Sequence, residues 1–360
     1  MDFDVLIIGG SIAGSSAALA LKGSGLNVGI IDKAVFPRRK PCGEGLSGRG
    51  FEALRSLGIS SNELLSLGQP FYGFIIERKG RVSHINSPDE FGLGISRLEL
   101  DSFLLNRTRE HTTFINDEVE DVSTSGEVFL RSSKLTAKVL IVGDGNGKIT
   151  KSFNKFSKRG TRSGVSALFS GTSNKSIDNV FIKICDEFEI YVTPLSVSTL
   201  NVAVLGTINS KVNIRDVLIS EELKEWLNIS VGFDGKLFSR VYGKSGLCNT
   251  RRECSVGRIL FAGDSVEQFD PLGGMGMTHA IITGILSGRA AQKILQTPSE
   301  EDKVKETYKT QQNSIAKPFR RHTRISQRFV QLARFLPSSI NLANTAVGHH
   351  AVKFIQRVTI

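Results

Sequence analysis

The sequence is poor in the residues that build metal sites, disulfide frameworks and membrane spans. Its 360 residues include four cysteines, with no C-x-x-C pair and no paired histidine, which excludes a zinc finger or a disulfide scaffold. Every stretch of about eighteen residues contains glycine, serine or a charged residue, so no transmembrane helix is expected. The chain opens Met-Asp-Phe-Asp, acidic where a signal peptide is basic. These absences predict a reduced, cytoplasmic setting without a metal site.

Acidic residues are also missing from the last part of the chain. The net charge is +11, yet residues 307–360 hold nine Lys and Arg and no Asp or Glu, so residues 1–306 are nearly neutral. A basic balance suggests a nucleic acid, a membrane surface or an acidic partner. Because the arginines flank apolar stripes and no nucleic-acid module is recognisable, no nucleic-acid partner is expected.

The N-terminal segment carries a dinucleotide-binding pattern. Residues 3–8 form an apolar strand pattern, followed by Gly-Gly-Ser-Ile-Ala-Gly at 9–14, a helical stretch and a second strand that ends at Asp32. Gly9 permits the tight turn, Gly14 permits close helix–strand packing, and the helix N-terminus offers N–H groups to a pyrophosphate. Asp32 is placed to accept hydrogen bonds from ribose hydroxyls. Ser11 takes the place of the middle glycine. This pattern alone does not distinguish NAD binding, FAD binding and a βαβ turn that binds no ligand.

A second pattern far downstream favours FAD. Residues 258–264 read as a strand that ends on Gly-Asp, and residues 270–277, Asp-Pro-Leu-Gly-Gly-Met-Gly-Met, lead into a helix over 278–295. Asp264 is suited to a ribityl hydroxyl, and backbone N–H groups at the helix start are suited to the electron-poor edge of a flavin. Two such sites about 250 residues apart suit one extended FAD better than NAD.

This order resembles the class A flavin monooxygenase and geranylgeranyl reductase-like superfamily. Residues 138–145 are similar to its Asp-Gly motif, Arg97 stands where that family places an arginine along the cofactor, and residues 37–45 match its P-x4-C-G-x-G pattern. For Arg97 the alternative is an exposed arginine at a helix start, and for Cys42 it is a buried structural thiol. Catalytic residues stay unknown because the chemistry is centred on the flavin; the candidates are Cys42 and Glu44. The resemblance implies cofactor contacts from Gly9, Ser11, Ile12, Ala13, Gly14, Asp32, Lys33, Arg39, Cys42, Gly43, Arg97, Gly143, Asp144, Gly263, Asp264, Pro271, Gly274, Met275, Gly276 and Met277.

The same resemblance implies an α/β fold: a Rossmann-like FAD domain of the glutathione reductase type, interrupted by a β-rich substrate domain and followed by helices. The FAD domain is expected from residues 1–70, 97–160 and 255–299, the substrate domain from 71–96 and 161–254, and a basic helical segment from 300–360. A hairpin is expected at 78–81. No second G-x-G-x-x-G lies at a strand-to-helix junction, so NAD(P)H is expected only as a transient reductant.

One segment bears on substrate recognition. Residues 188–194 stand where the reductases carry Y-x-W-x-F-P, but Glu189, Tyr191 and Thr193 occupy the aromatic places. The alternative is a plain edge strand with Glu187 and Glu189 on its wet face. The W-x-W-x-I-P signature of flavin halogenases is absent, and Trp226 is the only tryptophan.

The favoured function is FAD-dependent hydroxylation of a bulky aromatic or apolar substrate. A sub-hypothesis is hydroxylation of a tryptophan on a partner protein during quinone cofactor maturation. The alternatives are a reductase of isoprenoid or lipid double bonds, and a non-enzymatic flavin or lipid carrier. The substrate is therefore a small molecule, a lipid or a protein.

The basic segment predicts two helices. Residues 317–336 place Ile325, Phe329, Leu332 and Leu336 on one stripe beside Arg321, Arg324 and Arg328, and Pro337 ends the helix. A second stripe follows at Ala343, Val347, Ala351, Phe354, Ile355 and Val358. Either both helices pack on the body with arginines facing water, or they dock on an acidic protein or an anionic membrane surface. His322, His349 and His350 are interpreted as surface or packing residues.

Overall fold

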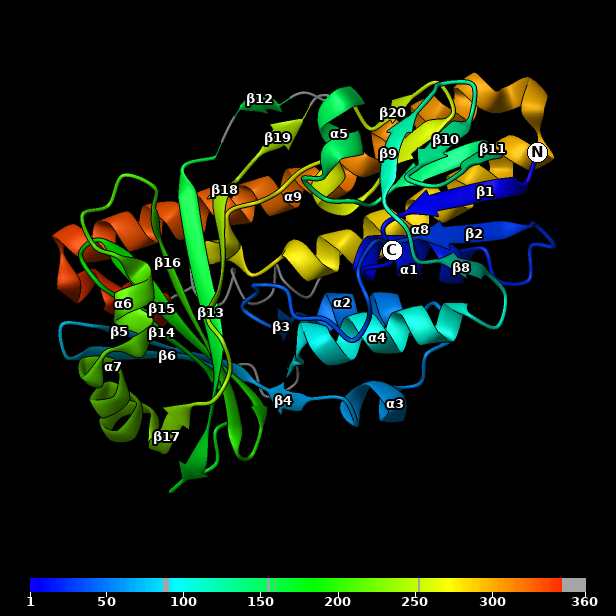
Figure 1. The fold of residues 1–360 in the computed structure, drawn as a ribbon. Helices are drawn as coiled ribbons and strands as arrows, with labels where there is room; N and C mark the ends of the chain where they lie inside the picture. Colours follow the sequence, from blue (N-terminus) through cyan, green and yellow to red (C-terminus); the bar gives the residue numbers. More distant parts are fainter. Residues whose placement is uncertain (87–90, 154–155, 159, 252, 345–360) are drawn as a thin grey trace.

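A computed structural model describes the chain except for residues 87–90, 154–155, 159, 252 and 345–360. It has the mixed α/β fold expected from the sequence. Two large sheets lie beside each other, and helix α9 (Glu301–Phe335) runs along both of them (Figure 1). Within the described residues, no helix is both long enough and apolar enough to cross a bilayer.

The first sheet has the N-terminal strand near its centre. Its central strands are all parallel, in the order β21 (Ile259–Phe261), β11 (Lys134–Val142), β1 (Phe3–Ile8), β2 (Val28–Ile31) and β8 (Thr113–Ile115). β20 (Ser255–Val256) pairs antiparallel with β21. The hairpin of β9 (Val119–Val122) and β10 (Glu127–Leu130) extends from β11.

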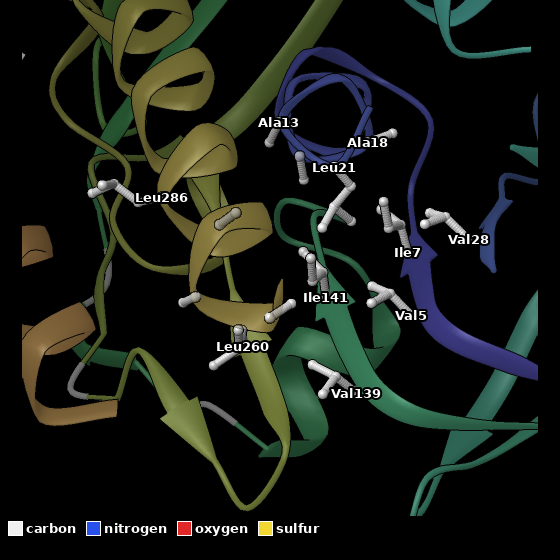
Figure 2. Close-up of a cluster of buried hydrophobic side chains, with 14 of the residues drawn as sticks. Val5, Ile7, Ala13, Ala18, Leu21, Val28, Val139, Ile141, Leu260 and Leu286 are labelled. Atoms are coloured by element: carbon white, nitrogen blue, oxygen red, sulfur yellow. The ribbon is translucent and has the colours of Figure 1, made fainter. Parts of the chain in front are cut away.

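The apolar run of β1 is buried on both faces. Val5 and Ile7 pack in the cluster formed with α1 (Ile12–Ala20) and α8 (Gly276–Gln296) (Figure 2). Leu6 and Ile8 belong to the opposite cluster, with the β9–β10 hairpin and α5 (Lys148–Phe153). A parallel strand covered on both sides is apolar throughout rather than alternating, which is the pattern that the sequence shows.

The second sheet is mostly antiparallel. Its order is β17 (Phe233–Leu237), β13 (Arg162–Ser173), β16 (Thr199–Thr207), β15 (Phe188–Ser196), β14 (Val180–Ile184), β5 (Gly73–Arg78) and β6 (Arg81–Asn86), with β18 (Tyr242–Leu247) paired to β13. All pairs are antiparallel except β14 with β5. The expected hairpin is confirmed: β5 and β6 meet at Lys79 and Gly80, whose φ values of 48° and 74° suit a tight turn.

Shorter elements complete the fold. The helices are α2 (Gly48–Arg55), α3 (Ser61–Leu65), α4 (Arg97–Thr108), α6 (Ile214–Ile219), α7 (Glu221–Trp226), η1 (Leu227–Val231), η2 (Gly263–Ser265), η3 (Pro271–Gly273), η4 (Pro298–Glu300) and η5 (Pro337–Asn344). The small sheets are β3 (Gly45–Leu46) with β7 (Gly92–Gly94) and β4 (Gln69–Phe71), and β12 (Phe156–Lys158) with β19 (Thr250–Arg251).

Helix α9 differs from its prediction at the N-terminal end. It begins at Glu301 rather than near residue 317, and it stops before Pro337 as expected, because the residue before a proline is driven out of helical geometry. Of the predicted apolar stripe, Ile325 and Phe329 face inward, but Leu332 and Leu336 are 42% and 54% exposed. The second predicted stripe begins at the end of η5 and otherwise lies outside the described residues.

Candidate cofactor and substrate site

Three sequence patterns meet at one edge of the first sheet. β1 ends at Ile8 before Gly9, β11 ends before Gly143, and β21 ends at Phe261, two positions before Gly263. Because β1, β11 and β21 are parallel neighbours, their carboxyl ends lie together. Open parallel sheets bind ligands at this edge, so the topology gathers segments up to about 250 residues apart into one site.

Two glycines shape the turn after β1. Gly9 has φ +102°, and a Cβ there would lie 2.8 Å from the Gly143 oxygen. A Cβ on Gly14 would lie 1.8 Å from the Gly9 oxygen. Neither position has room for a larger residue, so the turn stays tight. The start of α1 then faces the ligand edge of the sheet, where a pyrophosphate would bind.

Ser11 has a role that the glycine pattern did not reveal. Its hydroxyl donates to Asp101 Oδ2 at 2.8 Å and accepts from Arg97 Nη2 at 2.7 Å. Arg97 also pairs with Asp101 at 2.9 and 2.8 Å, and all three side chains are buried. Arg97 is therefore not an exposed arginine at a helix start. The serine joins α1 to α4 and holds the guanidinium at the site.

A cavity of about 390 Å³ opens at this edge and continues between the two sheets. The predicted residues that line it come from both ends of the sequence: Ser11, Ile12, Ala13, Cys42, Gly43, Glu44, Arg97, Gly143, Gly263, Asp264, Pro271, Gly274, Met275, Gly276 and Met277. α1 and α8 both begin at the cavity, and the first N–H groups of a helix lack intrahelical partners. Two such helix starts fit the pyrophosphate and the flavin edge of one FAD.

Other predicted residues lie around the cavity rather than in its lining. Asp32 accepts from the Gly10 and Ala34 N–H groups at 2.8 Å each and so fixes the turn. Lys33 is exposed and pairs with Glu118, whereas Arg39 lies 3.5 Å from Glu44. Asp144 accepts from the Thr150 hydroxyl and from N–H groups at the start of α5, so its carboxylate caps that helix. Gly9 and Gly14 act through the turn described above.

Two lysines that the motifs did not single out also line the cavity. Lys244 Nζ lies 3.7 Å from Asp264 Oδ2, and Gln268 donates to the same oxygen at 3.0 Å. Burial raises the pKa of Asp264, but Lys244 and Lys40 outweigh it and hold that pKa below its usual value. Burial and the nearby Arg97 lower the pKa of Lys40 to about 8. These cations face the cofactor end of the cavity and suit an anionic group there.

Cys42 and Glu44 are placed side by side at the cofactor end. The Cys42 sulfur accepts from the Glu44 N–H at 3.3 Å, and burial raises the pKa of the thiol, so it is not an activated nucleophile. Glu44 is 1% exposed and has φ +57°, an unfavourable backbone for a residue other than glycine. Its Oε1 accepts from the Arg97 N–H at 3.2 Å, whereas Oε2 has no partner among the described residues. Burial raises the pKa of Glu44 to about 7 against the opposing effects of Arg39 and Arg97.

The far end of the cavity is apolar and is closed by α9. Its lining there combines strands of the second sheet with the inner face of that helix: Phe74, Ile76, Ile85, Val165, Val180, Ile182, Ile184, Ala203, Leu205, Ile325, Phe329 and Val330. Tyr191 and Thr193 of β15 also line it. Burial raises the pKa of Tyr191 well above its usual value, so the phenol stays protonated. The chamber suits a bulky apolar substrate.

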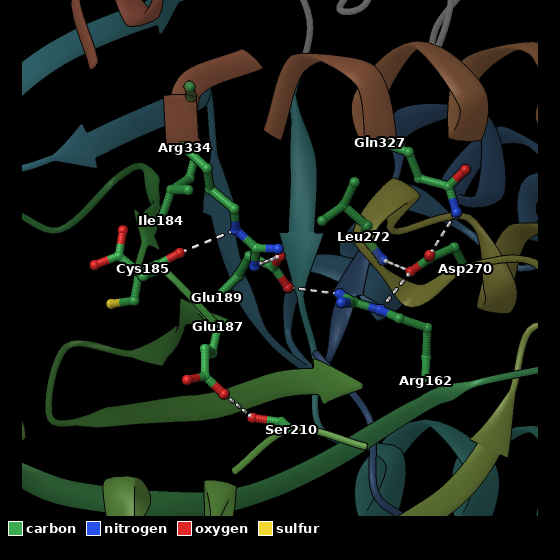
Figure 3. A network of polar contacts seen from close by, with 12 residues as sticks. Arg162, Ile184, Cys185, Glu187, Glu189, Ser210, Asp270, Leu272, Gln327 and Arg334 are labelled. Atoms are coloured by element: carbon green, nitrogen blue, oxygen red, sulfur yellow. Dashed lines mark hydrogen bonds and ion pairs between the residues drawn. The ribbon is translucent and has the colours of Figure 1, made fainter. Parts of the chain in front are cut away.

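The interpretation of β15 as an edge strand is wrong. It lies between β14 and β16. Of the two glutamates, only Glu187, which immediately precedes the strand, is exposed, and its carboxylate accepts from the Ser210 hydroxyl. Glu189 is 1% exposed and binds Arg162 Nη2 and Arg334 Nη2 at 2.5 Å each (Figure 3). A buried carboxylate needs such partners, and only the tertiary fold supplies them.

The same network reaches the cofactor loop. Arg162 Nε lies 3.4 Å from Asp270 Oδ1, the Leu272 N–H donates to that oxygen, and Gln327 of α9 donates to Asp270 Oδ2 at 2.7 Å (Figure 3). Asp270 opens the loop that carries Gly274 and Met275. The arginines of the predicted stripe, Arg321, Arg324 and Arg328, are exposed, whereas Arg334 of the same helix turns inward onto Glu189.

Comparison with known proteins supports the predicted cofactor and fold. Residues 2–146 match the model of the FAD binding domain family. The fold is shared with a geranylgeranyl bacteriochlorophyll reductase-like protein from Thermoplasma acidophilum, with a TM-score of 0.80 and 18% identity over 98% of this chain and 95% of that one. It is also shared with the flavin-dependent brominase Bmp2, with a TM-score of 0.76 and 17% identity over 98% and 93%. These identities show the fold alone. The chain therefore matches an FAD binding domain over residues 2–146 and shares its fold with these flavoproteins, as the motifs predicted.

Sequence relatives are more limited in extent. An uncharacterized protein of Methanosarcina barkeri is 32% identical over 159 residues, which cover 42% of this chain and 40% of that protein. A menaquinone reductase of Mycobacterium tuberculosis is 35% identical over 105 residues, which cover 27% and 24%. The chain thus spans less than half the length of either relative, and both similarities are partial.

Proposed function

We propose that this protein reduces a carbon–carbon double bond in a bulky apolar substrate, such as an isoprenoid lipid, with NAD(P)H as a transient electron donor. The observation that carries the proposal is Glu44, a buried acid that lines the cavity at its cofactor end and whose pKa is about 7. Adding hydrogen across a double bond needs a hydride equivalent and a proton. The bound cofactor supplies the former, and a carboxyl group that is half-protonated near neutral pH suits the latter.

The apolar end of the cavity supports the substrate class. Its aliphatic and aromatic walls exclude water and contribute binding energy in proportion to the apolar area they bury. Arg97, Lys40 and Lys244 gather at the other end, so one end suits anionic parts of a cofactor and the other a hydrocarbon. The partial similarity to a menaquinone reductase agrees with a lipid-like substrate.

Hydroxylation is the second candidate. It is favoured by β15, where Tyr191 and Thr193 stand in place of the aromatic residues that the reductases carry. A tryptophan on a partner protein, oxidised during quinone cofactor maturation, falls under this candidate. Both functions use the same cavity, and they differ in whether the product gains oxygen or hydrogen.

One experiment separates the candidates. The FAD-loaded protein is reduced with NADPH or NADH and incubated with detergent-dispersed isoprenoid lipids, with and without oxygen, and products are analysed by mass spectrometry. A product with two added hydrogens formed without oxygen supports the reductase, whereas a product with one added oxygen atom establishes the hydroxylase. A cofactor that is never reduced by either nucleotide would instead point to a flavin or lipid carrier.

A further inference from the structure

Helix α9 has two different faces. Its inner face contributes His322, Ile325, Ser326, Phe329 and Val330 to the cavity wall. Its outer face carries Lys317, Arg321, Arg324 and Arg328, all exposed and spaced by four, three and four residues, which places them on one line along the helix. We call these four residues the basic stripe.

The basic stripe continues into exposed apolar side chains. Leu332 and Phe335 follow Arg328 at the same helical spacing and are 42% and 89% exposed, and the next residue, Leu336, is 54% exposed. From Lys317 to Phe335 the line is about 27 Å long at 1.5 Å per residue. An exposed phenylalanine beside two exposed leucines is unfavourable in water. Burying these three side chains in an apolar environment recovers that free energy.

We infer that the outer face of α9 binds an anionic phospholipid surface, with the basic stripe on the headgroups and Leu332, Phe335 and Leu336 at the acyl boundary. Cations in line with exposed apolar side chains are the pattern of helices that lie in a membrane interface. An acidic protein would pair with the cations but would not by itself bury the apolar end. Residues 307–360 hold no acidic residue to oppose the attraction.

The position of this face relative to the cavity gives a second argument, which rests on the proposed apolar substrate. Val330 lines the far end of the cavity and packs in one cluster with Ala333 of α9 and Ile340 of η5. Leu332, Phe335 and Leu336 lie at the same end of α9 as Val330 and Ala333, but they are exposed. A protein lying on a bilayer by this face would hold the apolar end of its chamber next to the phase in which an apolar substrate is dissolved.

The test is vesicle co-sedimentation of the full-length, FAD-loaded protein. Vesicles are made of phosphatidylcholine alone or with about 30% phosphatidylglycerol, because anionic lipid creates the surface potential that attracts Lys and Arg. We expect binding to the anionic vesicles only, and its loss at high salt. Each Lys or Arg near such a surface contributes about fivefold, so R321E/R324E/R328E should lower the partition coefficient about a hundredfold or more.

Matched controls keep the result specific. K211E/K236E/R240E makes the same charge change at exposed positions on the second sheet and its loops. Its partition coefficient should stay within about twofold of the value expected from the lower net charge alone. L332S/F335S should weaken binding, whereas V197S/I229S, at residues 83% and 72% exposed elsewhere, should not. Flavin absorbance and melting temperature verify that each variant is folded.

Three outcomes would overturn the inference. These are equal binding to neutral and anionic vesicles, no binding to either, or equal losses in the stripe and control variants. Binding of poly-glutamate to the wild type, lost in the stripe variant without any vesicle binding, would assign the face to an acidic protein instead. Since no turnover is measured here, this result is independent of the double-bond reduction assay on dispersed lipid.

Discussion

Arg334 Nη2 lies 2.5 Å from Glu189 Oε1 and links the end of α9 to the middle of the second sheet. Arg162 binds the other oxygen of the same carboxylate. Arg78 of β5 adds a further link, since its guanidinium donates to the carbonyl oxygens of Ala333 and Arg334 at the C-terminal end of the helix. The helix that closes the cavity is therefore held by the buried Arg78 and the half-buried Arg334 rather than by apolar packing alone.

Glu189→Ala should destabilise the protein strongly. The substitution leaves Arg162 and Arg334 without their shared carboxylate, and removing one partner of a buried pair costs about 3–5 kcal/mol. We expect a lower melting temperature and weaker retention of FAD, since Arg162 also contacts Asp270 at the start of the cofactor loop. Thermal melts followed by flavin fluorescence measure both effects. Glu187→Ala, two residues away and exposed, is the control and should leave the melting temperature unchanged.

Glu44 should set the pH dependence of the proposed reaction. Its pKa is about 7 in the folded protein, so a proton donor at this position is lost as the pH rises through 7, and the rate should fall there. Glu44→Gln should lower the rate at least ~100-fold and abolish this limb of the profile. Rates of product formation between pH 5 and 9, compared with exposed Glu52→Gln, test this. An unchanged profile in Glu44→Gln would remove Glu44 from the chemistry.

The raised pKa of Glu44 also affects the free energy of unfolding. The unfolded carboxyl releases its proton near 4.5, before the folded one does, so the folded state loses stability as the pH rises from about 4.5 to 7. Glu44→Gln cannot ionise and should flatten this part of the stability curve by up to ~3 kcal/mol. Urea unfolding at several pH values measures it, and parallel curves for the two proteins would contradict the burial of this acid.

Asp101→Ala should release FAD. Asp101 is fully buried and pairs with Arg97 and Ser11. Burial raises the pKa of Asp101, but Arg97 outweighs this effect, and the pKa is lowered. Without it, a buried guanidinium is unpaired at a cost of about 3–5 kcal/mol. In the wild type, this stabilisation is present above pH 3.8 and is lost as the pH falls through the lowered pKa. FAD content after gel filtration reports the effect, and exposed Glu99→Ala on the same helix should retain the cofactor.

Gly14→Ala should disrupt the turn itself. The added Cβ would stand 1.8 Å from the Gly9 oxygen, which is backbone and cannot rotate away. We expect FAD binding to fall at least tenfold together with a lower melting temperature, measured by titration of the apoprotein. Gly80→Asn lies in an open turn at φ +74°, which asparagine tolerates, and should bind FAD normally.

The sequence by itself determined the local patterns of the cofactor site. The run at 3–8, the glycines at 9 and 14 and the segment at 270–277 each carry local geometry, because strand burial, tight turns and helix starts depend on near neighbours. Their order in the chain was enough to predict FAD and the class of fold. Ser11 shows the limit of this reasoning, because its partners Arg97 and Asp101 are about ninety residues away.

Only the tertiary structure decided what surrounds the cavity. Glu189 resembled a surface residue because an isolated strand cannot show that β14 and β16 flank it and that α9 brings Arg334 to its carboxylate. The raised pKa of Glu44 likewise depends on burial by segments distant in sequence. Charge burial is a property of the assembled fold, since the free energy of an ionised group is set by the solvent it has lost and the partners it has gained.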